Sequence, residues 1–108
     1  MKEVNIKFIN DNLENEYLSL QDNDRIKKKI NWVIEKIKQK PAFGQPIAKN
    51  LIPEEYKKQG VKNAFWVELS KSQRLIYSLT SEEINKITAI ILEWFARHKD
   101  YERRFGYS

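Results

Sequence analysis

The chain has 108 residues, of which 32% are charged and 12% are aromatic, and its formal net charge is +5. A chain of this length is expected to form a single domain, 1–108, and its aromatic content excludes a disordered tail. The absence of cysteine excludes disulfides and thiolate metal sites, and we expect neither a signal peptide nor a membrane span, because no apolar run is long enough.

The first half of the chain is predicted to form one strand followed by two helices. Residues 4–8 alternate between apolar and polar side chains, a period typical of a strand. Residues 12–21 have apolar side chains at mixed helical spacing and are predicted as a helix. A second helix begins at Arg25 and ends before Pro41, because the residue before a proline avoids the helical region. Its apolar residues recur along one side: Ile26, Ile30, Val33, Ile34 and Ile37.

The second half is predicted to contain a loop, a short helix and three strands. Residues 41–52 contain one glycine and two prolines and are predicted as a loop. Residues 53–60 are predicted as a short helix, with proline at its start and glycine past its end. The strands follow, separated by turns over 70–73 and 80–85: 65–70, 74–79 and 86–95. The resulting β-α-α-β-β-β order predicts an α+β domain, with two N-terminal helices packed on a small antiparallel sheet.

The last predicted strand is apolar on both of its sides. One side carries Ile87, Ala89, Ile91 and Phe95, and the other carries Ile90, Leu92 and Trp94. Two apolar sides predict a central strand that is covered on both faces. The strand leads into Arg97, His98 and Tyr101, so it brings the only histidine of the chain to the sheet edge beside cations and a phenol. The alternative interpretation is a solvated basic tail after a core strand.

The positive charge is concentrated in residues 24–40, which hold seven cations and two acids. A basic stripe of this kind suggests an anionic partner, either nucleic acid or an acidic protein. A lysine-rich, solvated helix face is an equally good interpretation of this segment.

Metal and cofactor sites are not expected. With one histidine and no cysteine, carboxylates are the main candidates for metal ligands, and the paired acids Glu54-Glu55 and Glu82-Glu83 are predicted to lie in a surface helix and a turn. None of the three glycines belongs to a loop that could cradle a phosphate. A Ser/His/Asp triad stays open, although no glycine-flanked serine supports it.

The residues that remain form a cationic and aromatic set suited to a phosphodiester. Arg74 opens the third strand, whose neighbour is the last strand, so it could face Arg97 and His98 on one surface. Metal-free RNA cleavage needs a base for the 2′-hydroxyl proton, cations for the charged phosphorane and an acid for the departing 5′-oxygen. Arginine suits the second task and histidine the first or third, and a tyrosine such as Tyr101 can stack on an unpaired base.

Each of these side chains also has a purely structural interpretation. Arg74 could form a surface ion pair with Glu82 or Glu83 of the following turn. Tyr101 could pack a C-terminal turn on the sheet. Trp66 is more typical of packing on the sheet than of a base-stacking platform.

Four blocks of the sequence occur in an order that fits a known family. They are Asp24-Arg25-Ile26 with Lys28-Lys29-Ile30-Asn31, Pro41-Ala42-Phe43-Gly44 with Lys49-Asn50-Leu51, Phe65-Trp66-Val67-Glu68-Leu69 with Arg74-Leu75-Ile76-Tyr77, and Arg97-His98-Lys99-Asp100-Tyr101. In turn they resemble the second-helix motif, the loop before the sheet, the strand hairpin and the terminal segment of the RelE/ParE superfamily of small toxins, including its YoeB-like branch. The resemblance covers nearly the whole chain.

The resemblance implies a RelE-like fold and a cytoplasmic toxin that cleaves mRNA in the ribosomal A site and is held inactive by a cognate antitoxin. Arg74 matches the arginine that stabilises the transition state, and His98, or Arg97 beside it, matches the acid/base position. Tyr101 matches the C-terminal tyrosine that stacks or assists proton transfer. The expected partners are the antitoxin, the ribosome and mRNA, without metal, cofactor or membrane. RNA contacts are predicted for Lys49, Lys71, Lys99, Arg103 and Arg104.

The chain departs from the family at the general base. Where RelE has lysines on the second strand, this chain has Trp66 and Glu68, and no acid stands in 45–48, where YoeB-like proteins have a glutamate. Glu68 is the candidate substitute. The chain also continues through residues 102–108, a tail longer than in YoeB-like members that could bring Tyr107 into the site or block it.

Two other functions fit the same fold. A ParE-like protein would inhibit DNA gyrase by binding it, and it would not require His98. A non-catalytic RNA- or protein-binding relative would have kept the fold and lost the chemistry, and the missing base favours this alternative.

Overall fold

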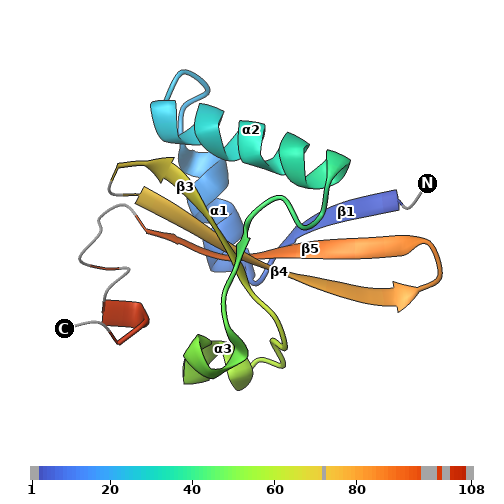
Figure 1. Ribbon diagram of the computed structural model, residues 1–108. Helices are drawn as coiled ribbons and strands as arrows, with labels where there is room; N and C mark the ends of the chain where they lie inside the picture. Colours follow the sequence, from blue (N-terminus) through green and yellow to red (C-terminus); the bar gives the residue numbers. More distant parts are fainter. Residues whose placement is uncertain (1–2, 72, 96–99, 101–102, 107–108) are drawn as a thin grey trace.

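A five-stranded sheet is covered on one face by two helices and on the other by a short helix and its flanking loops (Figure 1). The computed structural model describes residues 3–71, 73–95, 100 and 103–106. Helices α1 (Asp11–Ser19) and α2 (Arg25–Gln39) cover the first face, and α3 (Glu54–Lys57) covers the second. The strands are β1 (Glu3–Phe8), β2 (Gln45–Pro46), β3 (Phe65–Ser70), β4 (Gln73–Glu83) and β5 (Lys86–Phe95), in the order β1-β5-β4-β3-β2.

This architecture confirms the predicted α+β class, with two N-terminal helices on a sheet. Both helices, the short third helix and four of the strands lie where the sequence predicts them, within a few residues at their ends. One strand was missed, because β2 spans only two residues of the predicted loop 41–52 and pairs with β3 at Gln45↔Trp66 and Pro46↔Phe65. Two residues are too short a segment for alternation to be recognised.

The sheet is mixed and not purely antiparallel as predicted, because β1 pairs parallel with β5. The other three neighbouring pairs, β2–β3, β3–β4 and β4–β5, are antiparallel. The physical reason lies in the connections: β2, which follows α2, runs opposite to β1, and the segment 47–64 then reverses the chain again, so β3 and β1 run in the same direction. The position of β5 between β1 and β4 confirms that it is a central strand.

The hairpin between β4 and β5 is tighter than the predicted turn over 80–85. Strand β4 continues to Glu83, which pairs with Lys86, and the turn contains only Ile84 and Asn85. Asn85 has a φ of 66°, a left-handed conformation that asparagine tolerates better than most residues. The polar residues 80–83 suggest a loop in the sequence, but in the structure they form the end of the β4–β5 hairpin.

The main core lies between α2 and the sheet. Ile30, Val33 and Ile37 are 0% exposed, which confirms the apolar stripe predicted for this helix. They pack on Leu75 and Tyr77 of the sheet, which are also fully buried. The Asp24 carboxylate accepts a hydrogen bond from the Ile26 backbone N–H at 2.8 Å, so it caps the start of the helix.

A β-bulge in β5 changes which side chains face α3. Ile76 pairs with Glu93, but the next residue, Tyr77, pairs with Ile91, so Leu92 is an extra residue on β5. The predicted alternation therefore fails beyond Leu92: Trp94 packs with the α2-side core and not with Leu92 and Ile90. The same shift turns Glu93 toward α3, where its carboxylate meets the Tyr56 hydroxyl.

Two of the sequence blocks meet around the hydroxyl of Tyr77. This hydroxyl donates to the Pro41 carbonyl at 2.7 Å and accepts from the Gly44 N–H at 2.9 Å. A Cβ atom on Gly44 would lie 3.0 Å from both the Trp66 carbonyl oxygen and Cε1 of Tyr77, so this close approach requires glycine. The loop after α2 is thus fixed to the centre of the sheet.

Candidate functional site

Arg74 lies on the α3-side face of the sheet, in a row with Glu68 of β3. Glu68 pairs directly with Arg74, and Arg74 pairs with Phe95. Directly opposite residues of antiparallel strands point to the same face, with Cβ atoms about 5 Å apart. The prediction that Arg74 neighbours the last strand is therefore confirmed.

The guanidinium of Arg74 stacks on the indole of Trp66. Its central carbon lies 4.3 Å from the ring centroid, within the range of a favourable cation–π contact. Trp66 is itself packed against the α3-side core, which agrees with its structural interpretation. A stacked, half-buried guanidinium has few available rotamers, so its fork is held in a defined direction.

The predicted alternative of an ion pair between Arg74 and Glu83 is wrong. Glu83 lies at the opposite end of β4, and its carboxylate is 3.4 Å from the ammonium of Lys86. Arg74 and Glu83 are nine residues apart on one extended strand, which separates them by roughly 30 Å at about 3.3 Å per residue.

Glu68 is an exposed carboxylate beside Arg74. No acid occurs between Gln45 and Ala48, and Gln45 instead pairs with Trp66 at the edge of the sheet. The row therefore offers a planar cation and an acceptor oxygen on adjacent strands. Such a pair can bind a phosphate on one side and accept a proton on the other.

Several predicted site residues lie outside the described residues. They are Arg97, His98, Lys99 and Tyr101. The pairing of Arg74 with Phe95 brings Arg74 to the end of β5, two residues before Arg97. The juxtaposition of Arg74 and His98 remains a prediction.

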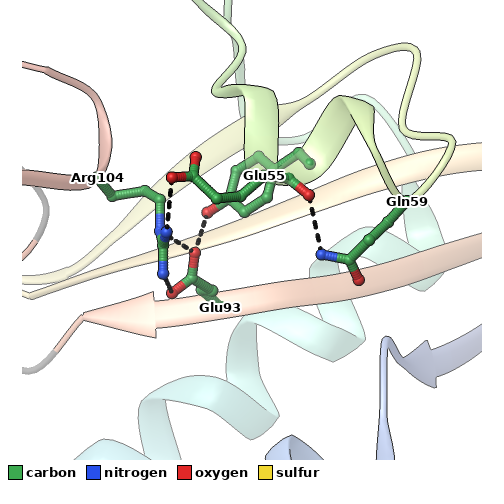
Figure 2. Close-up of polar contacts among 5 residues, drawn as sticks. Glu55, Gln59, Glu93 and Arg104 are labelled. Carbon is green, nitrogen blue, oxygen red and sulfur yellow. Dashed lines mark hydrogen bonds and ion pairs between the residues drawn. The ribbon is translucent and has the colours of Figure 1, made fainter.

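The predicted RNA-binding cations that the structure describes lie in different settings. Lys71 is exposed next to the end of β3, and Lys49 is exposed in a 3₁₀ turn, Lys49–Leu51. Arg103 is exposed near the C-terminus. Arg104, in contrast, is turned toward two carboxylates of the protein itself (Figure 2).

The Arg104 guanidinium lies between Glu93 of β5 and Glu55 of α3 (Figure 2). Its Nε is 2.7 Å from Oε1 of Glu93, and its Nη2 donates to Oε2 of the same carboxylate at 3.2 Å. Its Nη1 is 3.5 Å from Oε1 of Glu55. Burial alone would lower the pKa of Arg104, but the hydrogen bond and charge of Glu93 outweigh burial and raise it.

Tyr56 of α3 also contacts the carboxylate of Glu93. Its side chain is buried, with 2% of the residue exposed, and its hydroxyl donates to Oε1 of Glu93 at 2.6 Å. Burial raises the pKa of Tyr56, and the hydrogen bond to Glu93 raises it further. The phenol therefore stays protonated and acts as a fixed donor to the carboxylate.

The sequence interpretation missed Glu93 and its partners. The available signal was one acid within an otherwise apolar run, I-I-L-E-W-F over 90–95. A carboxylate in a covered strand needs a hydrogen-bonding or charged partner, so its position indicated a polar contact across the face. The identity of that partner depended on the bulge and on the path of the C-terminal segment.

Two absences concern the described part of the chain, those of membrane-spanning helices and of groups of possible metal ligands. No helix there is long and apolar enough to cross a membrane. Among the same described residues, no group of three or more histidines, aspartates and glutamates is arranged to hold a metal ion.

Comparison with known proteins relates the chain to solved toxin structures. No model of a protein family matches the sequence, and no curated protein matches it. The fold is similar to a YoeB/ParE toxin from Agrobacterium tumefaciens, with a TM-score of 0.58 and 14% identity over 83% of this chain and 94% of that one. It is also similar to a YoeB-YefM complex from Staphylococcus aureus, with a TM-score of 0.53 and 22% identity over 85% and 94%.

A YoeB dimer from Staphylococcus aureus gives a TM-score of 0.50 and 23% identity over 82% of this chain and 92% of that chain. These identities are low, so the likeness concerns the arrangement of the elements. The chain therefore has the fold of the YoeB/ParE toxins, the fold that its resemblance to the RelE/ParE superfamily predicts.

Proposed function

We propose that this protein is the toxin of a type II toxin–antitoxin pair and that it cleaves mRNA on the ribosome without a metal ion. The observation that carries this proposal is Arg74, whose guanidinium is stacked on Trp66, opposite Glu68 and next to the end of β5. The similarity to YoeB structures along more than four fifths of the chain supports a toxin of this fold.

In the proposed reaction a base removes the 2′-hydroxyl proton, and the 2′-oxygen attacks the adjacent phosphorus. Arg74 stabilises the negative charge on the phosphorane, and an acid gives a proton to the 5′-oxygen as its bond to phosphorus breaks. Glu68 is the proposed base, because it is the carboxylate opposite Arg74. His98, or Arg97 beside it, is the proposed acid, and Tyr101 is proposed to stack on a base.

The proposed partner is a cognate antitoxin, with the cytoplasm as the proposed compartment. Among the similar structures, the Staphylococcus aureus YoeB is found in complexes with YefM. Cations along α2 would favour an acidic partner segment. The ribosome is proposed to orient the mRNA, because orientation can lower a barrier by several kcal/mol.

Replacing Arg74 tests the proposal. Arg74→Ala should reduce single-turnover cleavage of ribosome-bound mRNA by about 10²–10³, as expected for loss of one transition-state donor. It should also abolish growth arrest when the chain is induced alone. Lys86→Gln is the control, because it removes a cation from an exposed ion pair at the other end of the hairpin. Full cleavage by the purified Arg74→Ala protein would remove Arg74 from the mechanism.

Inhibition of DNA gyrase remains the second candidate, because one of the similar structures is described as a YoeB/ParE toxin. A supercoiling assay beside the translation assay separates the two functions. Blocked supercoiling with intact mRNA would support the gyrase inhibitor, and harmless expression would support a non-catalytic binding module.

A further inference from the structure

The outward side of α2 carries an exposed tryptophan within a row of cations. The helix buries Ile30, Val33 and Ile37 against the sheet, whereas Trp32 is 44% exposed. Positions three, four or seven residues from Trp32 lie on the same side of an α-helix. Those occupied by cations are Arg25, Lys28, Lys29 and Lys36. Trp32 and these four cations together are called the Trp32 face.

The indole of Trp32 is held in place, and two ammonium groups border it. The ring of Phe43, from the loop after α2, meets the indole edge-on, with centroids 5.6 Å apart. The Lys29 ammonium lies 4.0 Å from the indole centroid and the Lys36 ammonium 5.5 Å from it. Both distances are within the range of cation–π attraction. The indole therefore organises two positive charges at the surface of the helix.

The cations of the Trp32 face are not neutralised by acids in the described part of the chain. There, the cations of α2 form two ion pairs, Lys27 with Asp22 at 3.2 Å and Lys38 with Glu35 at 3.4 Å. Neither Lys27 nor Lys38 belongs to the Trp32 face, and none of its four cations pairs with a carboxylate of the described residues. Their charge can therefore attract an anion from outside the protein.

The length of the Trp32 face suits a strand of phosphates. Lys36 follows Arg25 by eleven positions, a rise of about 16 Å along the helix. A nucleic-acid strand carries one phosphate per about 3.4 Å of duplex axis, so a stretch of this length meets several of them. Each lysine can bind a phosphate as a point charge.

The exposed indole favours a nucleotide over an acidic peptide. A nucleotide joins a flat ring and a phosphate in one unit, so it can contact an aromatic ring and a neighbouring cation together. A phosphate that draws the Lys29 ammonium off the indole would uncover the ring for the attached base. In a peptide, the apolar and the acidic side chains belong to separate residues.

We propose that the Trp32 face binds an unpaired nucleic-acid strand, with Lys29 and Lys36 on phosphates and a base stacked on Trp32. The sheet lies between this face and Arg74, so the strand bound here is not the one held for cleavage. The inference needs no nuclease chemistry, and only the choice of RNA as the strand rests on the proposed function.

Binding of a fluorescent 2′-O-methyl oligouridine of about 12 nucleotides to the full-length chain tests this proposal. The probe has no free 2′-hydroxyl, so the proposed reaction cannot cut it. Trp32→Ala should weaken binding about tenfold with an unchanged salt dependence, because the lost contact is uncharged. The Lys29→Gln/Lys36→Gln variant should weaken binding and make the slope of log K against log salt shallower by about 1.4, since each phosphate contact contributes about 0.7.

Two matched controls should bind the probe as the native chain does. Lys57→Gln/Lys86→Gln also removes two cations, and these come from exposed ion pairs with Glu54 and Glu83. Leu18→Ala removes an apolar side chain that is 61% exposed on α1. Urea unfolding shows whether each variant is folded, and the lysine variant tests the proposal even where Trp32→Ala is destabilised.

Equal weakening in the two double lysine variants would overturn the proposal, because binding would then follow net charge alone. Unchanged affinity in folded Trp32→Ala would overturn the stacked, unpaired strand. Tighter binding of an oligoglutamate peptide, with the same dependence on Lys29 and Lys36, would assign the face to an acidic protein instead. Tighter binding of an oligodeoxyuridine of the same length would overturn the choice of RNA.

The failure of this proposal is distinguishable from that of the proposed function. A protein that binds the probe through the Trp32 face but cuts no mRNA would overturn the nuclease and leave this surface in place. A protein that cuts mRNA on the ribosome but does not bind the probe would overturn the surface and leave the nuclease in place.

Discussion

At the scale of single residues, the site depends on which polar side chains share a row of the sheet. Arg74 and Glu68 are paired across two strands, and Trp66 lies under the guanidinium. The sequence predicted Arg74 as a site residue and left Glu68 as a substitute for a missing base. The observed pairing provides the reason to test that substitute first.

Glu68→Gln should lower single-turnover cleavage of ribosome-bound mRNA by about 10²-fold or more, because an amide cannot accept the 2′-hydroxyl proton. The amide keeps the size of the side chain, so unfolding should be unaffected. Glu83→Gln is the matched control, since it removes an exposed carboxylate at the far end of the same sheet. Equal loss in both variants, or in neither, would mean that Glu68 is not the base.

At the scale of elements, the loop after α2 and the β3–β4 hairpin form one unit around Tyr77. The Tyr77 hydroxyl bonds to Pro41 and Gly44, and Gly44 lies against the backbone of β3. This contact joins the two corresponding blocks of the sequence, because β4 supplies the hydroxyl and the loop supplies the N–H and the carbonyl that it bonds to.

Gly44→Ala should lower the free energy of unfolding by about 1–3 kcal/mol, because the added Cβ meets the Trp66 carbonyl oxygen at 3.0 Å. Tyr77→Phe should cost about 1–3 kcal/mol, because it leaves a buried N–H and a carbonyl unpaired. Urea unfolding measures both. Tyr17→Phe is the control, whose hydroxyl bonds to Asn31 on the exposed helix surface, and a cost as large as that of Tyr77→Phe would contradict the argument.

At the scale of the whole molecule, the two faces of the sheet have separate roles. The α2 face holds the main core and most of the basic segment, and the α3 face holds Arg74 and the C-terminal attachment. On α2, Trp32 is 44% exposed with the ammonium of Lys29 4.0 Å from its ring centroid. The sheet separates this basic surface from the Arg74 row, so the two would contact different parts of an anionic partner.

The same two faces each bury one tyrosine, which predicts a loss of stability in alkali. Burial is the main cause that raises the pKa of both Tyr56 and Tyr77 above the ordinary value of 10.0. A raised pKa means that the folded state holds its protons longer, so stability is complete below pH 10 and falls as the pH rises above it.

The free energy of unfolding in urea should therefore fall as the pH rises above about 10, and it should fall less in the Tyr56→Phe/Tyr77→Phe double variant. Lysine titration is shared by both proteins and cancels in the comparison. An identical decline in the two proteins would mean that these phenols do not contribute.

The sequence by itself determined the elements whose signals are local. The apolar stripe from Ile26 to Ile37 specified α2, and the alternation from Phe65 to Leu69 specified β3. The run 86–95, which is apolar on both of its sides, specified β5 as a central strand. In each case the pattern of buried positions repeats along consecutive residues, so it can be recognised without the partner segments. The family resemblance likewise led to the correct fold.

Only the tertiary structure decided what depends on pairing between distant segments. The bulge at Leu92 arises from the match between β4 and β5, and no alternation within one strand could place Glu93 beside Tyr56 or Trp94 beside α2. The sequence predicted Arg104 as an RNA contact from its charge, and the structure pairs its guanidinium with two carboxylates that lie 11 and 49 positions earlier in the chain. The charge of a side chain can be read from the sequence, but whether a carboxylate of the same protein lies beside it depends on the fold.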